Sequence, residues 1–196
     1  INLTQREIKG KYKRTVLGRL WSLANPLALM VVYSFVFAFI IRATPDPGNP
    51  SGLNIFPLWL LCGLLPWLFF ANTVNQGMGS LITNEALIKK VYFPRSLLVL
   101  SSSAAVLINW ITEMVVLVIA IVIAGAWQVV LWTPAVAVAM VMLAAFTLGI
   151  TLMLAIANVY FRDTQYLVTI LLQLGLYLAP IIYPISMVRQ QSERMG

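Results

Sequence analysis

Histidine is absent from this chain of 196 residues, and cysteine occurs once, as Cys62 within an apolar run. Zinc sites in proteins are built mainly from histidine and cysteine, so a zinc centre on this chain is improbable. A single cysteine also excludes a disulfide bond within the chain. We therefore expect no metal site, and we assign Cys62 to packing in the core.

Charge is scarce as well: 10% of the residues are charged, whereas 61% are hydrophobic and the mean hydropathy is +0.90. Soluble domains carry about a quarter charged residues, so the composition predicts an integral membrane protein. The net charge of +7 comes from 13 Lys and Arg against six acids. These cations lie mostly in short segments between apolar runs, which argues against a nucleic-acid partner.

Groups that would power transport or catalysis are also missing. The chain has no GxxxxGK[ST] loop, so it does not bind ATP in that manner by itself. Most of the acids fall in loops or termini, and no pair of carboxylates lies at the membrane midplane, as a carrier or a membrane glycosyltransferase would require. We predict that the chain is not an enzyme, has no catalytic residue or cofactor of its own, and receives its energy from outside.

Five stretches are apolar enough to cross a bilayer, whose hydrocarbon core needs about 20 residues of helix. They cover residues 26–41, 55–81, 97–124, 134–157 and 167–183. Most Lys and Arg then fall on one side of the membrane, so the N-terminus and the linker after the second span are predicted to be cytoplasmic. Five spans would leave the end of the chain outside, and we expect a sixth span to be missing there. The predicted fold class is an all-α, polytopic membrane helix bundle.

The first 24 residues form a segment of their own. Ile8, Tyr12, Val16 and Leu20 stand four apart, as on one stripe of a helix, and basic residues lie off that stripe. This pattern predicts an amphipathic helix along the cytoplasmic interface, although a solvated basic tail remains possible. Asn25 and Pro26 would cap the next helix, so we expect a break there and a permease domain over residues 25–196.

The linker between the second and third spans, L-I-T-N-E-A-L-I-K-K-V-Y-F-P-R over residues 81–95, is both basic and apolar. Its apolar side chains are more than a stop-transfer loop needs, so we predict that it docks on a protein. A helix lying on anionic lipid is the alternative. Pro94 should end the helix and direct the chain into the third span.

Polar side chains interrupt the spans at helical spacing. Asn72, Asn75 and Gln76 follow one another in the second span, and Asn109 and Glu113 stand four apart in the third. Lipid would reject these faces, so each should meet another helix, another subunit or a water-filled path. Glu113 either bonds within the bundle, lines or gates a path, or relays protons.

Three weaker patterns involve aromatic residues, small residues and prolines. Aromatic residues should form belts at the outer membrane interface, although Trp67 and Tyr177 could instead line a pathway and stack on sugar rings. Ala145 and Gly149 form a small-xxx-small pair that would let helices approach closely. Proline at 180 and 184 predicts a break near the outer leaflet.

Five motifs occur in order along the chain: REIKGKYKRTVLGRLWSLANPL at 6–27, GLLPWLFF at 63–70, LIKKVYFPR at 87–95, NVYFRDT at 158–164 and LAPIIYP at 178–184. With them the sequence resembles the permease subunits of type-2 ABC exporters, specifically the branch that exports polysaccharides, O-antigen, galactan and teichoic acids. The resemblance covers nearly the whole chain. It implies a six-span permease in the bacterial inner membrane that forms a homodimer and pairs with two copies of an ABC ATPase, on which ATP and Mg are bound.

The resemblance also implies roles for particular residues. A coupling helix over about 84–96 would contact the ATPase through Glu85, Leu87, Ile88, Lys89, Lys90, Val91, Tyr92, Phe93, Pro94 and Arg95. Arg162 and Asp163 would make a second cytoplasmic contact. The N-terminal helix would act as a gate, with Lys9, Lys11, Lys13 and Arg14 holding the headgroup of a lipid-linked glycan. The pathway would be lined by Asn72, Asn75, Gln76, Asn109, Glu113, Trp67 and Tyr177.

The function that follows is that of a permease subunit exporting a lipid-linked polysaccharide, driven by a separate ATPase. A type-2 permease for a drug or a simple lipid would have the same architecture. A channel or carrier independent of nucleotide is an alternative of another class, and the lack of ionisable residues at the midplane argues against it.

Overall fold

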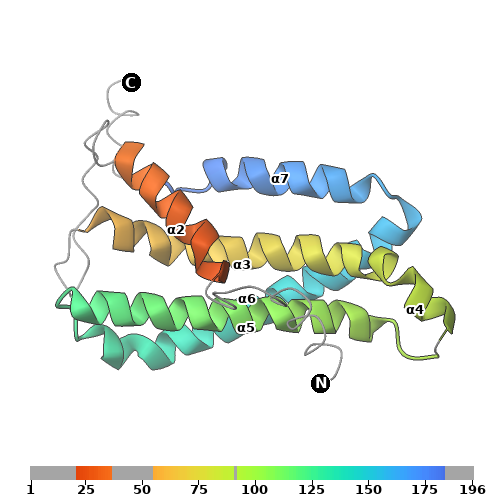
Figure 1. The fold of residues 1–196 in the computed structure, drawn as a ribbon, viewed down its shortest axis with the longest axis horizontal. Coiled ribbons are helices and arrows are strands. Elements are labelled where there is room, and N and C mark those ends of the chain that lie inside the picture. Colours follow the sequence, from red (N-terminus) through yellow and green to blue (C-terminus); the bar gives the residue numbers. More distant parts are fainter. Residues whose placement is uncertain (1–20, 37–54, 91, 184–196) are drawn as a thin grey trace.

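The computed structural model describes residues 21–36, 55–90 and 92–183, and in these ranges all regular structure is helical (Figure 1). The helices are α2 (Trp21–Ser34), α3 (Phe56–Thr83), α4 (Glu85–Lys90), α5 (Ser96–Ile123), α6 (Val129–Tyr160) and α7 (Thr164–Leu178). The predicted all-α fold class is confirmed for these ranges.

Among the described residues, three helices are long and apolar enough to cross a membrane: α3 and α5 with 28 residues each, and α6 with 32. A helix of 28 residues is about 42 Å long, which exceeds the hydrocarbon core of about 30 Å. These helices coincide with the second, third and fourth predicted spans. The apolar helices α2 and α7 have 14 and 15 residues, so the first and fifth spans stay predictions.

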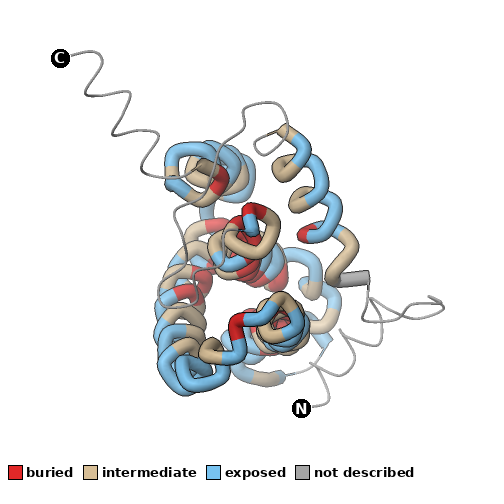
Figure 2. The backbone as a smooth tube through the Cα atoms, turned by 90° about the vertical axis from the view of Figure 1, so that its left-hand side faces the viewer, coloured by how far each residue is buried: buried red, intermediate tan, exposed pale blue. Residues whose placement is uncertain are grey.

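Helix α3 occupies the centre of the bundle. It contacts α2, α5, α6 and α7, and Figures 1 and 2 show it with α5 on one side and α7 on the other. At the end of the bundle away from α4, the core is apolar and includes Leu65, Phe69 and Trp110. The rings of Phe69 and Trp110 stack with centroids 4.1 Å apart. Aromatic packing of this kind anchors α3 to α5.

Toward α4, the same three long helices pack through small and polar side chains. An added Cβ on Gly77 of α3 would clash with the Thr151 Cγ2 atom of α6 and lie 3.4 Å from the Ser103 Oγ atom of α5. The buried Asn158 side chain of α6 donates to the Met78 carbonyl of α3 over 3.1 Å. The Thr151 hydroxyl donates to its own helix, at the Thr147 carbonyl. We call Gly77, Ser103, Thr147, Thr151 and Asn158 the polar seam.

Several sequence predictions are wrong at the level of individual residues. Gly149 faces open space and Ala145 is exposed, so this small-xxx-small pair makes no close helix contact in the protomer. Cys62 is exposed rather than in the core. Both errors have one cause: in a membrane helix the lipid-facing residues are as apolar as the packed ones, so hydrophobicity does not identify the packed face.

Two helices begin earlier than predicted. Pro26 and Pro134 were expected at helix starts, but they lie inside α2 and α6, so the expected break at Asn25 and Pro26 is wrong. Each proline is the sixth residue of its helix and removes one hydrogen bond near the helix start, a loss that membrane helices tolerate. The break near Pro180 is confirmed, since α7 ends at Leu178 and Ala179 is extended.

Candidate functional site

Helix α4 follows α3 after a single residue, Asn84. The Asn84 side chain donates to the Ser80 carbonyl over 2.9 Å, and the Asn84 carbonyl accepts the N–H groups of Leu87 and Ile88 at 3.0 and 3.1 Å. Asn84 therefore ends one helix and begins the next. One hydrogen-bonded residue thus joins α3 to α4.

The helical part of the linker is shorter than the predicted range of about 84–96. It stops at Lys90, and Tyr92, Phe93 and Pro94 have no regular structure. Proline disfavours helical conformation in the residue before it, which explains why the helix does not reach Phe93. The Pro94 carbonyl accepts the Leu97 N–H over 3.0 Å, so Pro94 also leads the chain into α5, as predicted.

The charged face of α4 points to solvent. The Lys89 ammonium lies 2.6 Å from the Glu85 carboxylate, one helical turn away, and both side chains are exposed. This hydrogen bond and the positive charge of Lys89 lower the pKa of Glu85, with a smaller contribution from Arg162. Lys90 is also exposed.

The apolar side chains of the linker differ in exposure. Leu87, Ile88 and Phe93 are half-buried, whereas Tyr92 has a relative exposure of 105%. Val91 lies outside the described residues. A fully exposed aromatic side chain next to a basic helix is typical of an anchor for a partner protein.

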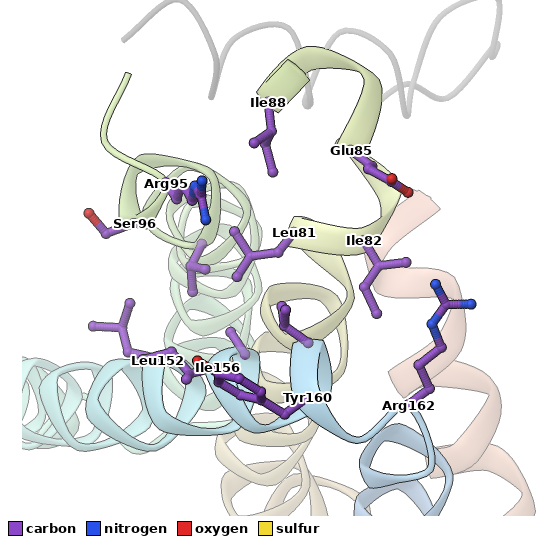
Figure 3. Close-up of a pocket in the computed structure, with 13 residues that line it drawn as sticks. Leu81, Ile82, Glu85, Ile88, Arg95, Ser96, Leu152, Ile156, Tyr160 and Arg162 are labelled. Carbon is purple, nitrogen blue, oxygen red and sulfur yellow. The ribbon is translucent and has the colours of Figure 1, made fainter. Parts of the chain in front are cut away.

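A cavity of about 520 Å³ lies behind α4, between the end of α3, the start of α5 and the end of α6 (Figure 3). Its walls include Glu85, Ile88 and Arg95 from the linker and Arg162 from the loop after α6. The structure thus brings together two stretches that are about 70 residues apart in the sequence. Asp163 is exposed at the start of α7, where its carbonyl accepts the Leu167 N–H.

The polar residues predicted on α3 lie in two different environments: one contacts α7 and two are exposed. The Asn75 amide oxygen accepts a hydrogen bond of 2.9 Å from the Thr169 hydroxyl of α7. Asn72 and Gln76, one turn apart, are both exposed. Asn75 therefore meets another helix, as predicted, and the protomer leaves the other two amides uncovered.

The remaining residues predicted to line a pathway do not lie together. Asn109 is buried in α5, with no hydrogen-bond partner at its amide oxygen, and Glu113 is half-buried one turn further on. Trp67 packs against Gly175, where an added Cβ would lie 2.7 Å from the indole ring. Tyr177 is exposed, and its carbonyl accepts the Tyr183 hydroxyl. A pathway built from this set stays a prediction.

The basic residues predicted to hold a headgroup, Lys9, Lys11, Lys13 and Arg14, lie outside the described residues. Within the described ranges, no group of three or more acids and cysteines is placed to hold a metal ion.

Sequence reasoning missed the polar seam. Thr147, Thr151 and Ala155 recur every four residues and are all buried, which is the small-residue spacing that permits close helix contact. That signal is present in the sequence, two residues along from the predicted pair Ala145 and Gly149. The partners across the seam, Gly77 and Ser103, could not be assigned without the structure.

Comparison with known proteins gives one family and several relatives. The ABC-2 type transporter family matches residues 1–192. The O-antigen export system permease protein RfbA of Myxococcus xanthus is 33% identical over 99% of this chain and 71% of its own length. The protein of that name from Klebsiella pneumoniae is 30% identical over 96% of this chain and 70% of its own length. The polysialic acid transport protein KpsM of Escherichia coli is 31% identical over 42% of this chain and 30% of its own length.

Proposed function

The chain belongs to the ABC-2 type transporter family, and from that premise we propose that it is the permease subunit of an ATP-driven exporter of a lipid-linked polysaccharide. The observation that carries the substrate class is the similarity to O-antigen export permeases over 96–99% of the chain. The proposed location is the bacterial inner membrane, with the N-terminus in the cytoplasm, because the basic segments then lie inside.

The permease is proposed to be a transport subunit without catalytic residues of its own. ATP and Mg would be bound by two copies of an ABC ATPase on separate chains. The α4 segment is the part suited to receive that partner, since it combines exposed Lys89 and Lys90 with the projecting Tyr92. Aromatic side chains are enriched at protein interfaces, and exposed lysines attract a partner surface of opposite charge.

Closure of the ATPase pair would move α4, and the structure supports two routes onward. One passes through Asn84 into α3. The other passes through Arg95 into α5, which begins at the next residue. Because these helices pack against α6 through the polar seam, a shift of α4 would change the packing of all three long helices.

The exposed amides of Asn72 and Gln76 support a homodimer with the export path at its interface. Leaving two amides in lipid is unfavourable, so a second permease or a hydrated path should cover them. The basic N-terminal helix would recruit the substrate through its phosphate headgroup. The cluster of Lys and Arg in this N-terminal segment supports the role.

The docking role of α4 is tested by charge reversal. Lys89→Glu and Lys90→Glu together should abolish co-purification of the ATPase and export, because repulsion replaces attraction at the interface. Membrane insertion should be unchanged. The matched control, Lys89→Arg with Lys90→Arg, keeps both charges and should keep the complex. Normal co-purification with the reversed variant would refute the proposal.

A further inference from the structure

The geometry behind α4 points to a lipid site: we propose that the cavity between α3, α4, α5 and α6 binds an anionic membrane phospholipid. Arg95 and Arg162, on opposite sides of the cavity (Figure 3), would attract its anionic headgroup, and an acyl chain would lie between α5 and α6. This site is distinct from the proposed export path and does not depend on which substrate is exported.

The apolar part of the cavity extends from the helix ends along α5 and α6. Val99 lies one turn inside α5, and Leu152 and Ile156 lie one to two turns before the end of α6. Leu81 and Ile88 close the opposite wall. The volume of about 520 Å³ is in the range of about 300–1,000 Å³ found for small-molecule sites. These walls suit a hydrocarbon chain.

The charged part of the cavity lies at the level where a phospholipid carries its phosphate. Arg95 directly precedes α5, and Arg162 follows α6 by two residues, so both stand at the ends of membrane-spanning helices. Figure 3 shows them on opposite sides of the cavity. Arginine is well suited to phosphate because its planar guanidinium donates several hydrogen bonds.

The charge balance selects an anion. Of the four Lys and Arg in the described ranges, Arg95 and Arg162 line this cavity, whereas Lys89 and Lys90 do not. The one carboxylate on the wall, Glu85, is already paired with Lys89. The site therefore carries excess positive charge beside an apolar interior, which fits an anionic amphiphile better than a zwitterionic one.

Position favours a lipid over the partner ATPase as the occupant. A protein bound to the outward face of α4 would meet Tyr92 and Lys90 first. Val99 and Leu152 of the cavity wall belong to helices that are long and apolar enough to cross a membrane, so a lipid can reach the cavity from the side of the bilayer. A bound lipid would brace α4 against α5 and α6.

Native mass spectrometry of the full-length permease, purified without its ATPase, tests the proposal. Phosphatidylglycerol and phosphatidylcholine with the same acyl chains are titrated onto the delipidated protein. Phosphatidylglycerol should bind about thirtyfold more tightly, the factor expected for two cations near an anionic headgroup. Arg95→Gln combined with Arg162→Gln should abolish the preference, and Lys90→Gln should preserve it.

A cavity-filling variant distinguishes the contribution of the acyl chain to binding from that of the headgroup. Ile156→Trp, at a half-exposed lining position, should weaken binding of both lipids while retaining the preference. Equal affinity of the wild type for the two lipids would overturn the proposal, as would a preference that survives loss of both arginines. Co-expression with the ATPase supplies a further outcome: a double glutamine variant that keeps its lipid preference but no longer co-purifies the ATPase would assign the arginines to the partner contact and overturn the lipid assignment. Because no ATPase is present in the lipid titration, failure of the exporter proposal does not affect this result.

Discussion

A single glycine determines how closely the long helices approach one another at the α4 end of the bundle. Gly77 lies where α3 meets α5 and α6, with the Thr151 methyl group and the Ser103 hydroxyl as its neighbours. Membrane helices gain little from apolar burial against lipid, so close contact and interhelical hydrogen bonds carry their association. The seam is therefore sensitive to the addition of one methyl group.

Gly77→Ala should destabilise the permease by about 1–3 kcal/mol, the usual cost of overpacking, because its Cβ would collide with the Thr151 Cγ2 atom. Thermal unfolding of the purified protein should show a Tm lowered by about 3–10 °C. Adding Thr151→Ser removes that methyl group, keeps the hydroxyl bond to Thr147, and should restore most of the loss.

The matched control is Gly149→Ala, on a helix face with open space around the Cβ position. It should leave Tm unchanged or slightly raised, since alanine favours helix over glycine. An unchanged Tm for Gly77→Ala, or failure of Thr151→Ser to rescue it, would show that the three helices are not packed this closely.

At the scale of elements, the sequence predicts the type and length of the long helices better than it predicts which face of each helix is packed. Apolar runs located α3, α5 and α6 because a membrane helix requires about 20 such residues in any arrangement. The same uniformity hid which face of α6 is packed, since Thr151 and Gly149 are both compatible with an apolar helix. The prolines led to a different error. Pro26 and Pro134 are typical of helix starts, but both lie inside their helices.

Only part of the candidate site could be predicted, because local sequence patterns locate single elements and not the contacts between them. The linker composition located α4, and Pro94 explains its short length once the restriction on the preceding residue is considered. Its contact with the loop at Arg162 depends on how α6 returns to the α4 end, which is a tertiary property. Local patterns contain no signal for the cavity that these segments share.

The exposed polar face of α3 supplies a test at the same scale. Asn72→Leu with Gln76→Leu should leave the stability of the protomer unchanged, because both side chains are exposed there. Export should fall roughly tenfold, as expected from losing one or two hydrogen bonds across a membrane interface. Glycan export in cells and Tm of the purified protein are the two measurements.

The control swaps the two amides, Asn72→Gln with Gln76→Asn, and should retain most export because the face stays polar. Wild-type export by the leucine variant would mean that lipid covers this face. A large drop in Tm would place the two residues in the protomer's own packing.

For the molecule as a whole, the central claim is that energy enters at the α4 end of the bundle. The long helices place the α4 segment at one end and the connection between α5 and α6 at the other, as Figure 1 shows. Tyr92 projects at the first end, and Trp127 is exposed at the second with a relative exposure of 65%. An ATPase in the cytoplasm can contact only one of them.

Site-specific crosslinking decides which end that is. With the chain's only cysteine removed as Cys62→Ser, Tyr92→Cys and Trp127→Cys are compared in permease co-expressed with its ATPase. A short bifunctional reagent should join Tyr92→Cys to the ATPase and leave Trp127→Cys unlinked in an equally intact complex. Crosslinking at Trp127→Cys, or no crosslink at Tyr92→Cys while the ATPase still co-purifies, would contradict the account.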